Sequence, residues 1–357
     1  MSARTIALDA FGSDACPTPE IEAAVAAARD GLHVVLVGDV DRLRPALAAY
    51  PGADSLPLRL HHAADAITMD DSPAKAVRAK ADASMPVCFD LVKRGEADAV
   101  VSAGNSGAML ACGLFKFGRI KGVDRPAIVN NVPGPRGDCA LLDMGANVEC
   151  KPLNLIQFAV MGAAFAACTQ GKARPRVGVL SNGSEEGKGT ELTRAAHALL
   201  RAHSSPAFHY AGYVEGRDLF SGEVDVVVTD GFTGNVALKV LEGTARAMVE
   251  FLRAAVLGSR ISKIGALLMR PAFAALKQRV DPDSYGGAPL LGVDGIAIIA
   301  HGGATPKAIV NALRLADRFV ASGLTPGLRE AITGHREIFA AAKAAEAEGR
   351  GGREEAR

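Results

Sequence analysis

The sequence predicts a Rossmann-like α/β fold, with a mostly parallel sheet and helices on both of its faces. Short runs rich in β-branched residues alternate with longer stretches of helical periodicity, which is typical of consecutive βαβ units. Hydrophobic residues make up 49% of the 357 positions, yet there are four Tyr and no Trp. Alanine, valine and leucine therefore have to fill the core, as they do in a parallel sheet that is buried on both faces.

Ten strands are predicted along the chain, and helices fill most of the gaps between them. The expected strands are residues 5–9, 33–37, 58–61, 99–102, 127–131, 140–143, 177–181, 208–212, 224–229 and 296–300. The turn Pro133-Gly134-Pro135-Arg136-Gly137 separates two of these runs. It predicts one antiparallel pair in the otherwise parallel sheet.

We interpret residues 1–335 as a single α/β catalytic domain from which an amphipathic helical hairpin protrudes at about residues 240–280. A chain of this length also allows two domains. An Ala/Glu/Lys run near the C-terminus passes into Gly349-Arg350-Gly351-Gly352-Arg353. Residues 336–357 are therefore expected to form a terminal helix that frays into a disordered tail.

Composition and motifs exclude several function classes. A formal net charge of +1 gives no overall attraction to nucleic acid. Six scattered cysteines form no Cys-x-x-Cys pair, so neither a metal site nor a disulfide framework is expected. The first predicted turn, Gly12-Ser13-Asp14-Ala15, lacks the spacing of a dinucleotide-binding loop, and no P-loop is present. With neither a signal peptide nor a run of about twenty apolar residues, the protein is expected to be cytoplasmic.

Three apolar runs each pass into a turn built from Gly, Asn or Asp and then into a predicted helix. The turns are Ser102-Ala103-Gly104-Asn105-Ser106-Gly107, Asp143-Met144-Gly145-Ala146-Asn147 and Asp230-Gly231-Phe232-Thr233-Gly234-Asn235. A helix N-terminus after such a turn offers unpaired N–H groups and the positive end of the helix dipole to an anion. We expect the three turns to converge at the carboxyl ends of parallel strands. For any single turn, the alternative is that Gly and Asn only make a tight connection.

Four motifs that occur in the same order resemble the PlsX family of phosphate acyltransferases. They are the segments 102–108, 142–148, 230–236 and 285–295, and the similarity runs from about residue 4 to about residue 320. Enzymes of this family convert acyl-acyl-carrier-protein and inorganic phosphate into acyl phosphate for phospholipid synthesis. The resemblance implies these substrates and no cofactor. Phe11, Ser13, Ser181 and Asn182 depart from the family pattern.

The predicted reaction needs no protein nucleophile, because phosphate itself attacks and a thiolate leaves. The protein has to supply positioning and donors for the oxyanion of the tetrahedral intermediate. Asn235 is the first choice for this catalytic donor, and Asn147, Lys239 and His301 are further candidates. The alternatives are a solvated surface lysine for Lys239 and a capping or packed imidazole for His301.

The remaining site residues are expected to bind the substrates, phosphate above all. Asp143 and Asp230 cannot face a phosphate directly, so we expect them to hold loop amides or neighbouring side chains. The full set of predicted binding residues is Ser102, Gly104, Asn105, Ser106, Gly107, Asp143, Lys188, Asp230, Gly231 and Gly234. Two other functions stay open at this point: a phosphotransacetylase-like enzyme that uses acyl-CoA, and a non-catalytic scaffold of lipid synthesis.

The segment from Phe251 to Val280 is locally basic and has no acidic residue. Apolar residues alternate with its cations, which is typical of a helix in a membrane interface, although the same apolar face suits a dimer contact. The resemblance implies a homodimer that attaches peripherally to an anionic membrane and passes acyl phosphate to a membrane glycerol-phosphate acyltransferase. The expected membrane-contact residues are Lys263, Ile264, Leu267, Leu268 and Arg270.

Overall fold

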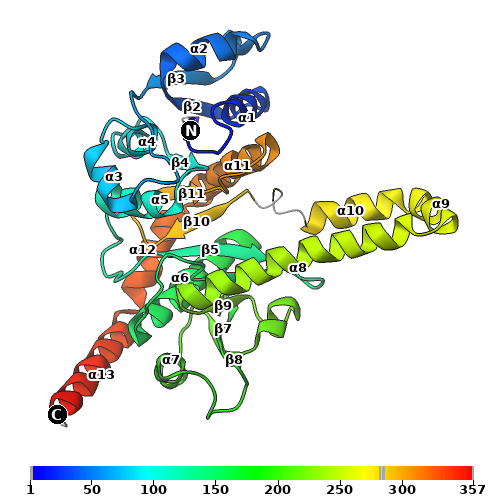
Figure 1. The fold of residues 1–357 in the computed structure, drawn as a ribbon. Helices are drawn as coiled ribbons and strands as arrows, with labels where there is room; N and C mark the ends of the chain where they lie inside the picture. Colours follow the sequence, from blue (N-terminus) through cyan, green and yellow to red (C-terminus); the bar gives the residue numbers. More distant parts are fainter. Residues whose placement is uncertain (1–2, 281–282, 284–285, 356–357) are drawn as a thin grey trace.

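A single mixed sheet forms the centre of the molecule (Figure 1). The computed structural model describes residues 3–280, 283 and 286–355, and within them the sheet has 11 strands in the order β3-β2-β1-β4-β11-β10-β5-β6-β9-β7-β8. The strands are β1 (Thr5–Asp9), β2 (His33–Gly38), β3 (Leu58–His62), β4 (Ala99–Ser102), β5 (Ala127–Val132), β6 (Cys139–Leu142), β7 (Arg176–Leu180), β8 (His209–Val214), β9 (Val226–Val228), β10 (Ala288–Leu291) and β11 (Ile296–Ile299). The predicted α/β class is confirmed.

Strand β10 is not among the predicted strands; it contains Pro289 and follows Gly286-Gly287. Such a composition predicts a turn, because proline cannot donate to a ladder and is rare inside sheets. Tyr285, the first residue of the fourth motif, lies outside the described residues.

The sheet reverses direction in its middle. Strands β1, β2, β3, β4 and β11 are mutually parallel, β10 is antiparallel to β11 and β5, and β5 is antiparallel to β6. Strands β6, β9, β7 and β8 are again parallel to one another. The β5–β6 hairpin around residues 133–137 confirms the predicted antiparallel pair. We call the edge with the carboxyl ends of β1, β4 and β11 the first edge, and the opposite edge, with those of β6, β9 and β7, the second edge.

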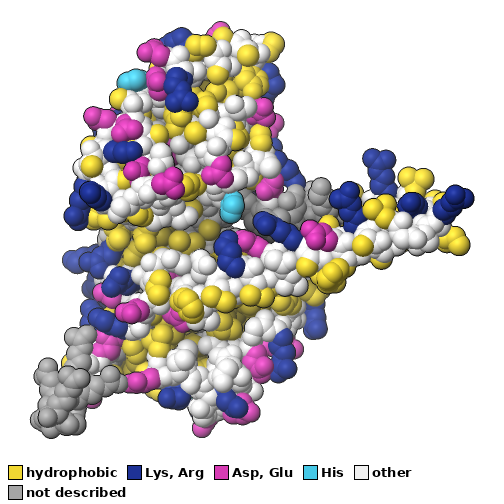
Figure 2. All heavy atoms as spheres, viewed as in Figure 1, with side chains coloured by type: hydrophobic (Ala, Val, Ile, Leu, Met, Phe, Trp, Pro, Cys, Tyr) yellow, Lys and Arg dark blue, Asp and Glu magenta, His cyan; other side chains and the backbone are white. Residues whose placement is uncertain are grey.

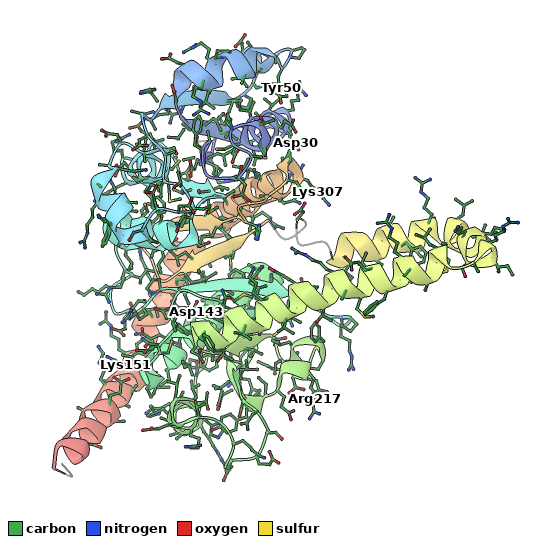
Figure 3. The ribbon with its side chains drawn as sticks, viewed as in Figure 1. Asp30, Tyr50, Asp143, Lys151, Arg217 and Lys307 are labelled. Carbon is green, nitrogen blue, oxygen red and sulfur yellow. The ribbon has the colours of Figure 1, made fainter. Side chains whose placement is uncertain are left out.

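This reversal shows that the prediction of one convergent site was wrong. The turn at residues 102–107 follows β4 and lies at the first edge, whereas the turns at residues 143–147 and 230–235 follow β6 and β9 and lie at the second edge. Figure 3 shows Asp143 beside the start of α8 (Gly231–Leu257) and Lys307 far from it, at the start of α11 (Pro306–Ser322).

Helices cover both faces of the sheet because successive strand residues point to opposite sides. Ile6 and Leu8 of β1 belong to the core cluster that includes α11, α1 (Thr18–Arg29) and α6 (Pro152–Gln170). Ala7 belongs to the cluster that includes α4 (Ser84–Lys93) and α5 (Ser106–Cys112). The other helices of the two layers are α2 (Val40–Ala48), α3 (Pro73–Ala79), α7 (Glu191–Ala202) and α12 (Leu324–Gly334).

Helix α6 is packed deeply in the fold. Among the described residues it is long and apolar enough to cross a membrane, but 72% of that apolar window is buried inside the fold. Phe158 and Met161 are completely buried against the sheet. Its apolar composition is therefore that of a core helix.

Helix α8 and the two helices that follow it form a hairpin that projects from the sheet (Figure 1), which confirms the predicted protrusion. The chain turns back through α9 (Arg260–Leu268) and α10 (Arg270–Val280). Arg279 near the end of α10 donates to the carbonyl of Gly134 at 2.7 Å, so the returning helix is fastened to the β5–β6 turn. Helix α13 (Arg336–Glu355) lies at the C-terminus. The division into domains and the fraying of this last helix stay predictions.

Candidate active site

At the first edge, Ser102 and Asp9 hold the turns after β4 and β1 together. The Ser102 hydroxyl donates to Oδ2 of Asp9 at 2.7 Å and accepts the N–H of Gly104 at 3.0 Å. Burial raises the pKa of Asp9, and hydrogen bonds from Ser84 and Ser102 partly oppose that shift. Both hydrogen-bonding functions of the predicted ligand Ser102 are thus used within the protein.

Gly104 is required by the close approach of two backbones. A Cβ at this position would lie 2.9 Å from Cε of Met85 and 3.3 Å from Cα of Gly12, and a Cβ on Gly12 would lie 2.8 Å from the Gly104 nitrogen. No side chain fits between these loops without displacement. Ser13 has no positive φ, so its departure from the family pattern strains no backbone.

Asn105 also acts within the protein. Its Oδ1 accepts the N–H of Ala108 and caps α5, while its Nδ2 lies within 3.2–3.4 Å of the carbonyls of residues 68, 69 and 71. Ser106 and Gly107 form the first turn of α5. His301, which follows β11, is exposed, and its Nδ1 accepts the N–H of Gly303 at 3.1 Å. The neutral imidazole therefore carries its proton on Nε2.

At the second edge, Asp143 organises the loop after β6. The side chain is completely buried and accepts five hydrogen bonds. Its Oδ1 accepts the amides of Ile128, Gly145 and Ala146, and its Oδ2 accepts the amide and the side chain of Asn147. Burial raises the pKa of Asp143, whereas these donors favour the carboxylate and oppose the shift.

Asn147 has no amide hydrogen left for a ligand. Besides its contact with Asp143 at 2.9 Å, Nδ2 donates to the carbonyl of Pro126 at 2.7 Å, and the side chain is buried. This geometry favours a positioning role for Asn147 over the predicted role of oxyanion donor.

The start of α8 lies directly on the Asp143 loop. The N–H of Gly231 donates to the carbonyl of Asn147 at 2.7 Å. A Cβ on Gly234 would lie 1.9 Å from the carbonyl oxygen of Asp143, so only glycine allows this contact. The turns after β6 and β9 therefore do meet, and glycines at positions 231 and 234 serve backbone packing.

Asp230 caps α8, and Asn235 is left with free donor capacity. The Asp230 carboxylate accepts the amide and the hydroxyl of Thr233, both at 2.8 Å. Asn235 is exposed, and its Nδ2 makes one long hydrogen bond of 3.4 Å to the carbonyl of Met144. Within the described residues its second amide hydrogen has no partner, so it is available to a ligand.

The two predicted lysines differ in their surroundings. Lys239, one helical turn beyond Asn235, forms an ion pair of 3.0 Å with Glu242. Lys188 is exposed in the loop after β7, and among the described residues it has no acidic partner. Its stem folds over Gly183, where an added Cβ would lie 2.9 Å from Cγ of Lys188. Lys188 thus keeps its charge available to an anion.

The helices α6, α7 and α8 all begin at the second edge, because β6, β9 and β7 are parallel neighbours. Their N-termini bring positive dipole ends to one region. Cys150 lies between them, with Sγ 3.6 Å from the carbonyl of Asn147, and burial raises the pKa of this thiol to about 12. The thiol is protonated at neutral pH and is not a nucleophile. The cluster can therefore stabilise an anion but supplies no attacking group.

Two residues of this region were not singled out from the sequence. Cys150 precedes α6, and Thr190 caps α7 by accepting the N–H of Thr193 at 3.2 Å. Their position immediately before a helix that follows a strand is the signal that identifies them.

The chain is similar to known proteins over nearly its whole length. A family described as "Fatty acid synthesis protein" matches residues 4–326. A phosphate acyltransferase of Geobacter sulfurreducens is 49% identical over 345 residues, which cover 95% of this chain and 99% of that protein. A phosphate acyltransferase of Geotalea uraniireducens is 51% identical over 335 residues, which cover 94% of this chain and 96% of that protein.

Solved structures share the fold at low sequence identity. A phosphotransacetylase from Streptococcus pyogenes matches with a TM-score of 0.56 and 15% identity, and the match covers 89% of this chain and 94% of that chain. EutD phosphotransacetylase from Staphylococcus aureus gives a TM-score of 0.54 and 16% identity over the same shares. These similarities concern the fold alone.

We predict that Asp143→Ala destabilises the protein far more than Asp230→Ala. The first change removes the acceptor of several buried amides and should lower the free energy of unfolding by at least about 3 kcal/mol. The second removes an N-cap and should cost about 1 kcal/mol. Urea unfolding of both variants measures the difference. Equal losses would contradict the central role of Asp143.

Proposed function

The chain belongs to the PlsX family of phosphate acyltransferases, and from this premise we propose that it transfers a fatty acyl group from acyl-acyl-carrier-protein to inorganic phosphate. Acyl transfer to phosphate follows from the family. The carrier-protein donor, and the use of the acyl phosphate in phospholipid synthesis, are our proposals. They rest on the resemblance of the four motifs and on a family description that refers to fatty acid synthesis.

The single observation that favours the second edge as the reaction site is the free donor capacity of two exposed side chains. Lys188 has no acidic partner among the described residues, and Asn235 has a spare N–H. An anionic nucleophile and an oxyanion both require such donors. No protein nucleophile is needed, which agrees with the protonated state of Cys150.

In the proposed reaction, a phosphate oxygen attacks the carbonyl carbon of the thioester. The carbonyl oxygen becomes an oxyanion and accepts a hydrogen bond from Asn235, while Lys188 attracts the phosphate. The carbon–sulfur bond then breaks, and the electron pair leaves with a thiolate that needs no strong acid, since a thiol pKa is about 8.5. Asp143 and Asn147 hold the loop after β6 against the start of α8.

The donor separates this proposal from its alternatives. We expect acyl phosphate to form from acyl-acyl-carrier-protein in the presence of phosphate and to be absent without it. Faster turnover of the matching acyl-CoA would favour the phosphotransacetylase-like alternative. No product from either donor would favour a scaffold.

We predict that phosphate raises the melting temperature of the protein through Lys188, because a ligand that binds only the folded state stabilises it. Lys188→Ala should reduce this shift, whereas Ser106→Ala at the first edge should leave it unchanged. Differential scanning fluorimetry across a phosphate series measures both. The opposite pattern would assign phosphate to the turn at residues 104–107.

A second prediction concerns Asn235. If its amide donates to the oxyanion, Asn235→Ala should lower kcat by roughly a hundredfold, as loss of such a donor does in other enzymes. Val236→Ala, its exposed neighbour, is the matched control and should retain turnover. A loss below about threefold, with the fold intact by circular dichroism, would contradict the role of Asn235.

We propose further that the hairpin carries both the membrane contact and a dimer contact of a cytoplasmic, peripherally membrane-associated enzyme. Apolar and basic side chains gather at its outer end (Figure 2). Leu267 and Leu268 are 68% and 79% exposed, and Lys263 and Arg270 are exposed nearby. Helix α8 separately exposes Met248 and Phe251 along its length, which suits a second copy of the chain. A membrane glycerol-phosphate acyltransferase is the proposed consumer of the product.

We predict that the protein sediments with anionic liposomes and that salt weakens this binding, because salt screens exposed charges. Leu267→Glu/Leu268→Glu should abolish sedimentation while the dimer mass in light scattering is retained. Binding that survives these changes, or a dimer that is lost with them, would contradict the division between the hairpin tip and α8.

A further inference from the structure

A groove of about 910 Å³ opens beside the second edge, between the start of α6, helix α7 and helix α13. This volume lies in the range of roughly 300–1,000 Å³ that is usual for ligand sites. Small and aliphatic side chains form most of its surface, and they come from all three helices. They include Pro152, Leu192, Ala195, Leu199, Ala342 and Ala345.

The groove adjoins the start of α8 through one residue. Cys150 lines the groove, and its Sγ contacts the carbonyl of Asn147, the same carbonyl that accepts the N–H of Gly231. Lys151 and Thr190, the N-caps of α6 and α7, line the groove as well, so a molecule in it would have one part beside these two helix N-termini.

Helix α13 is fastened as a wall of this groove. Oε1 of Glu346 accepts the N–H of Leu153 at 3.2 Å, in the first turn of α6. Figure 3 shows Lys151, which precedes α6, beside α13, in agreement with this contact. Four charged or polar residues also line the groove: Lys151, Thr190, Glu191 and Glu346.

We propose that this groove holds the fatty acyl chain of the donor and of the acyl phosphate product. The inference rests on the proposed function, and it adds a binding site for the apolar part of the substrate. The polar head would lie at the helix N-termini and the chain would run along α7. Burial of each methylene favours binding by up to about fourfold, so an apolar groove next to the reacting carbonyl selects long chains.

The length of the groove suits such a chain. From Thr190 to Leu199, helix α7 advances about 13 Å, at roughly 1.5 Å per residue. An extended chain advances roughly 1.2 Å per bond, since a residue of three bonds spans about 3.3–3.6 Å. About ten or eleven carbons therefore fit along α7.

The test places a large side chain of α13 in the groove and compares donors with short and long acyl chains. Ala345→Trp places a large side chain in the groove, and Ala344→Trp, its exposed neighbour outside the lining, is the matched control. Ala345→Trp should lower kcat/KM for hexadecanoyl-acyl-carrier-protein at least tenfold and for the butyryl donor less than twofold. The control should change neither value. Equal effects on both donors, or no effect, would overturn the proposal.

A binding measurement keeps this test independent of the reaction. The fluorescent fatty acid cis-parinarate should bind the wild-type protein and bind Ala345→Trp at least fivefold more weakly. A wild type that turns over no donor but shows this difference would overturn the proposed function and retain the groove. Unchanged binding would overturn the groove. A change in oligomeric mass without any dependence on chain length would assign the groove to a second copy of the chain and overturn its role for acyl chains.

Discussion

The buried carboxylate of Asp143 is the interaction on which the second half of the molecule depends. It gathers amides from β5 and from its own loop, and it orients Asn147. Asn147 in turn presents the carbonyl that accepts the N–H of Gly231, so this side chain supports the contact at which α8 begins. Burial alone would disfavour the charged form of the carboxylate, and the hydrogen bonds from the surrounding amides offset this effect. A rigid loop at this point also fixes Asn235, which lies one turn into α8.

The reversal of the sheet at β5 and β6 decides which residues work together. Because the carboxyl ends of parallel strands are where α/β sheets bind ligands, a sheet with two opposed halves has two such edges. The antiparallel hairpin was predictable from its Pro and Gly residues. Its consequence for the turns was not, since a single sequence gives the direction of each strand only after the pairing partners are known. The three motifs that look equivalent in sequence are therefore divided between two places.

Local patterns were sufficient for most of the fold. Apolar runs located every strand except β10, where Pro289 and two glycines conceal a short ladder. The protruding hairpin followed from a cationic segment with no acidic residue. A sequence pattern does not show which polar side chains have hydrogen-bond partners within the protein. Asn105, Asn147 and Asn235 carry the same side-chain amide and cannot be told apart in the sequence. Only the structure shows that the amides of the first two donate to neighbouring backbone carbonyls.

Whether the polar groups of a turn already have hydrogen-bond partners also indicates which edge of the sheet binds the substrates. Buried polar groups are normally paired, so a turn whose donors and acceptors are all used serves the fold. At the first edge, Ser102 and Asn105 are engaged in this way. At the second edge, Asp143 and Asn147 are equally satisfied, but they support exposed groups with remaining capacity, Asn235 and Lys188. The hydrogen-bonded residues Asp143 and Asn147 thus support Asn235 and Lys188, whose own donors stay available to a ligand. The aliphatic groove that begins at Cys150 adds the apolar half of a site for a molecule with an anionic head and a hydrocarbon tail.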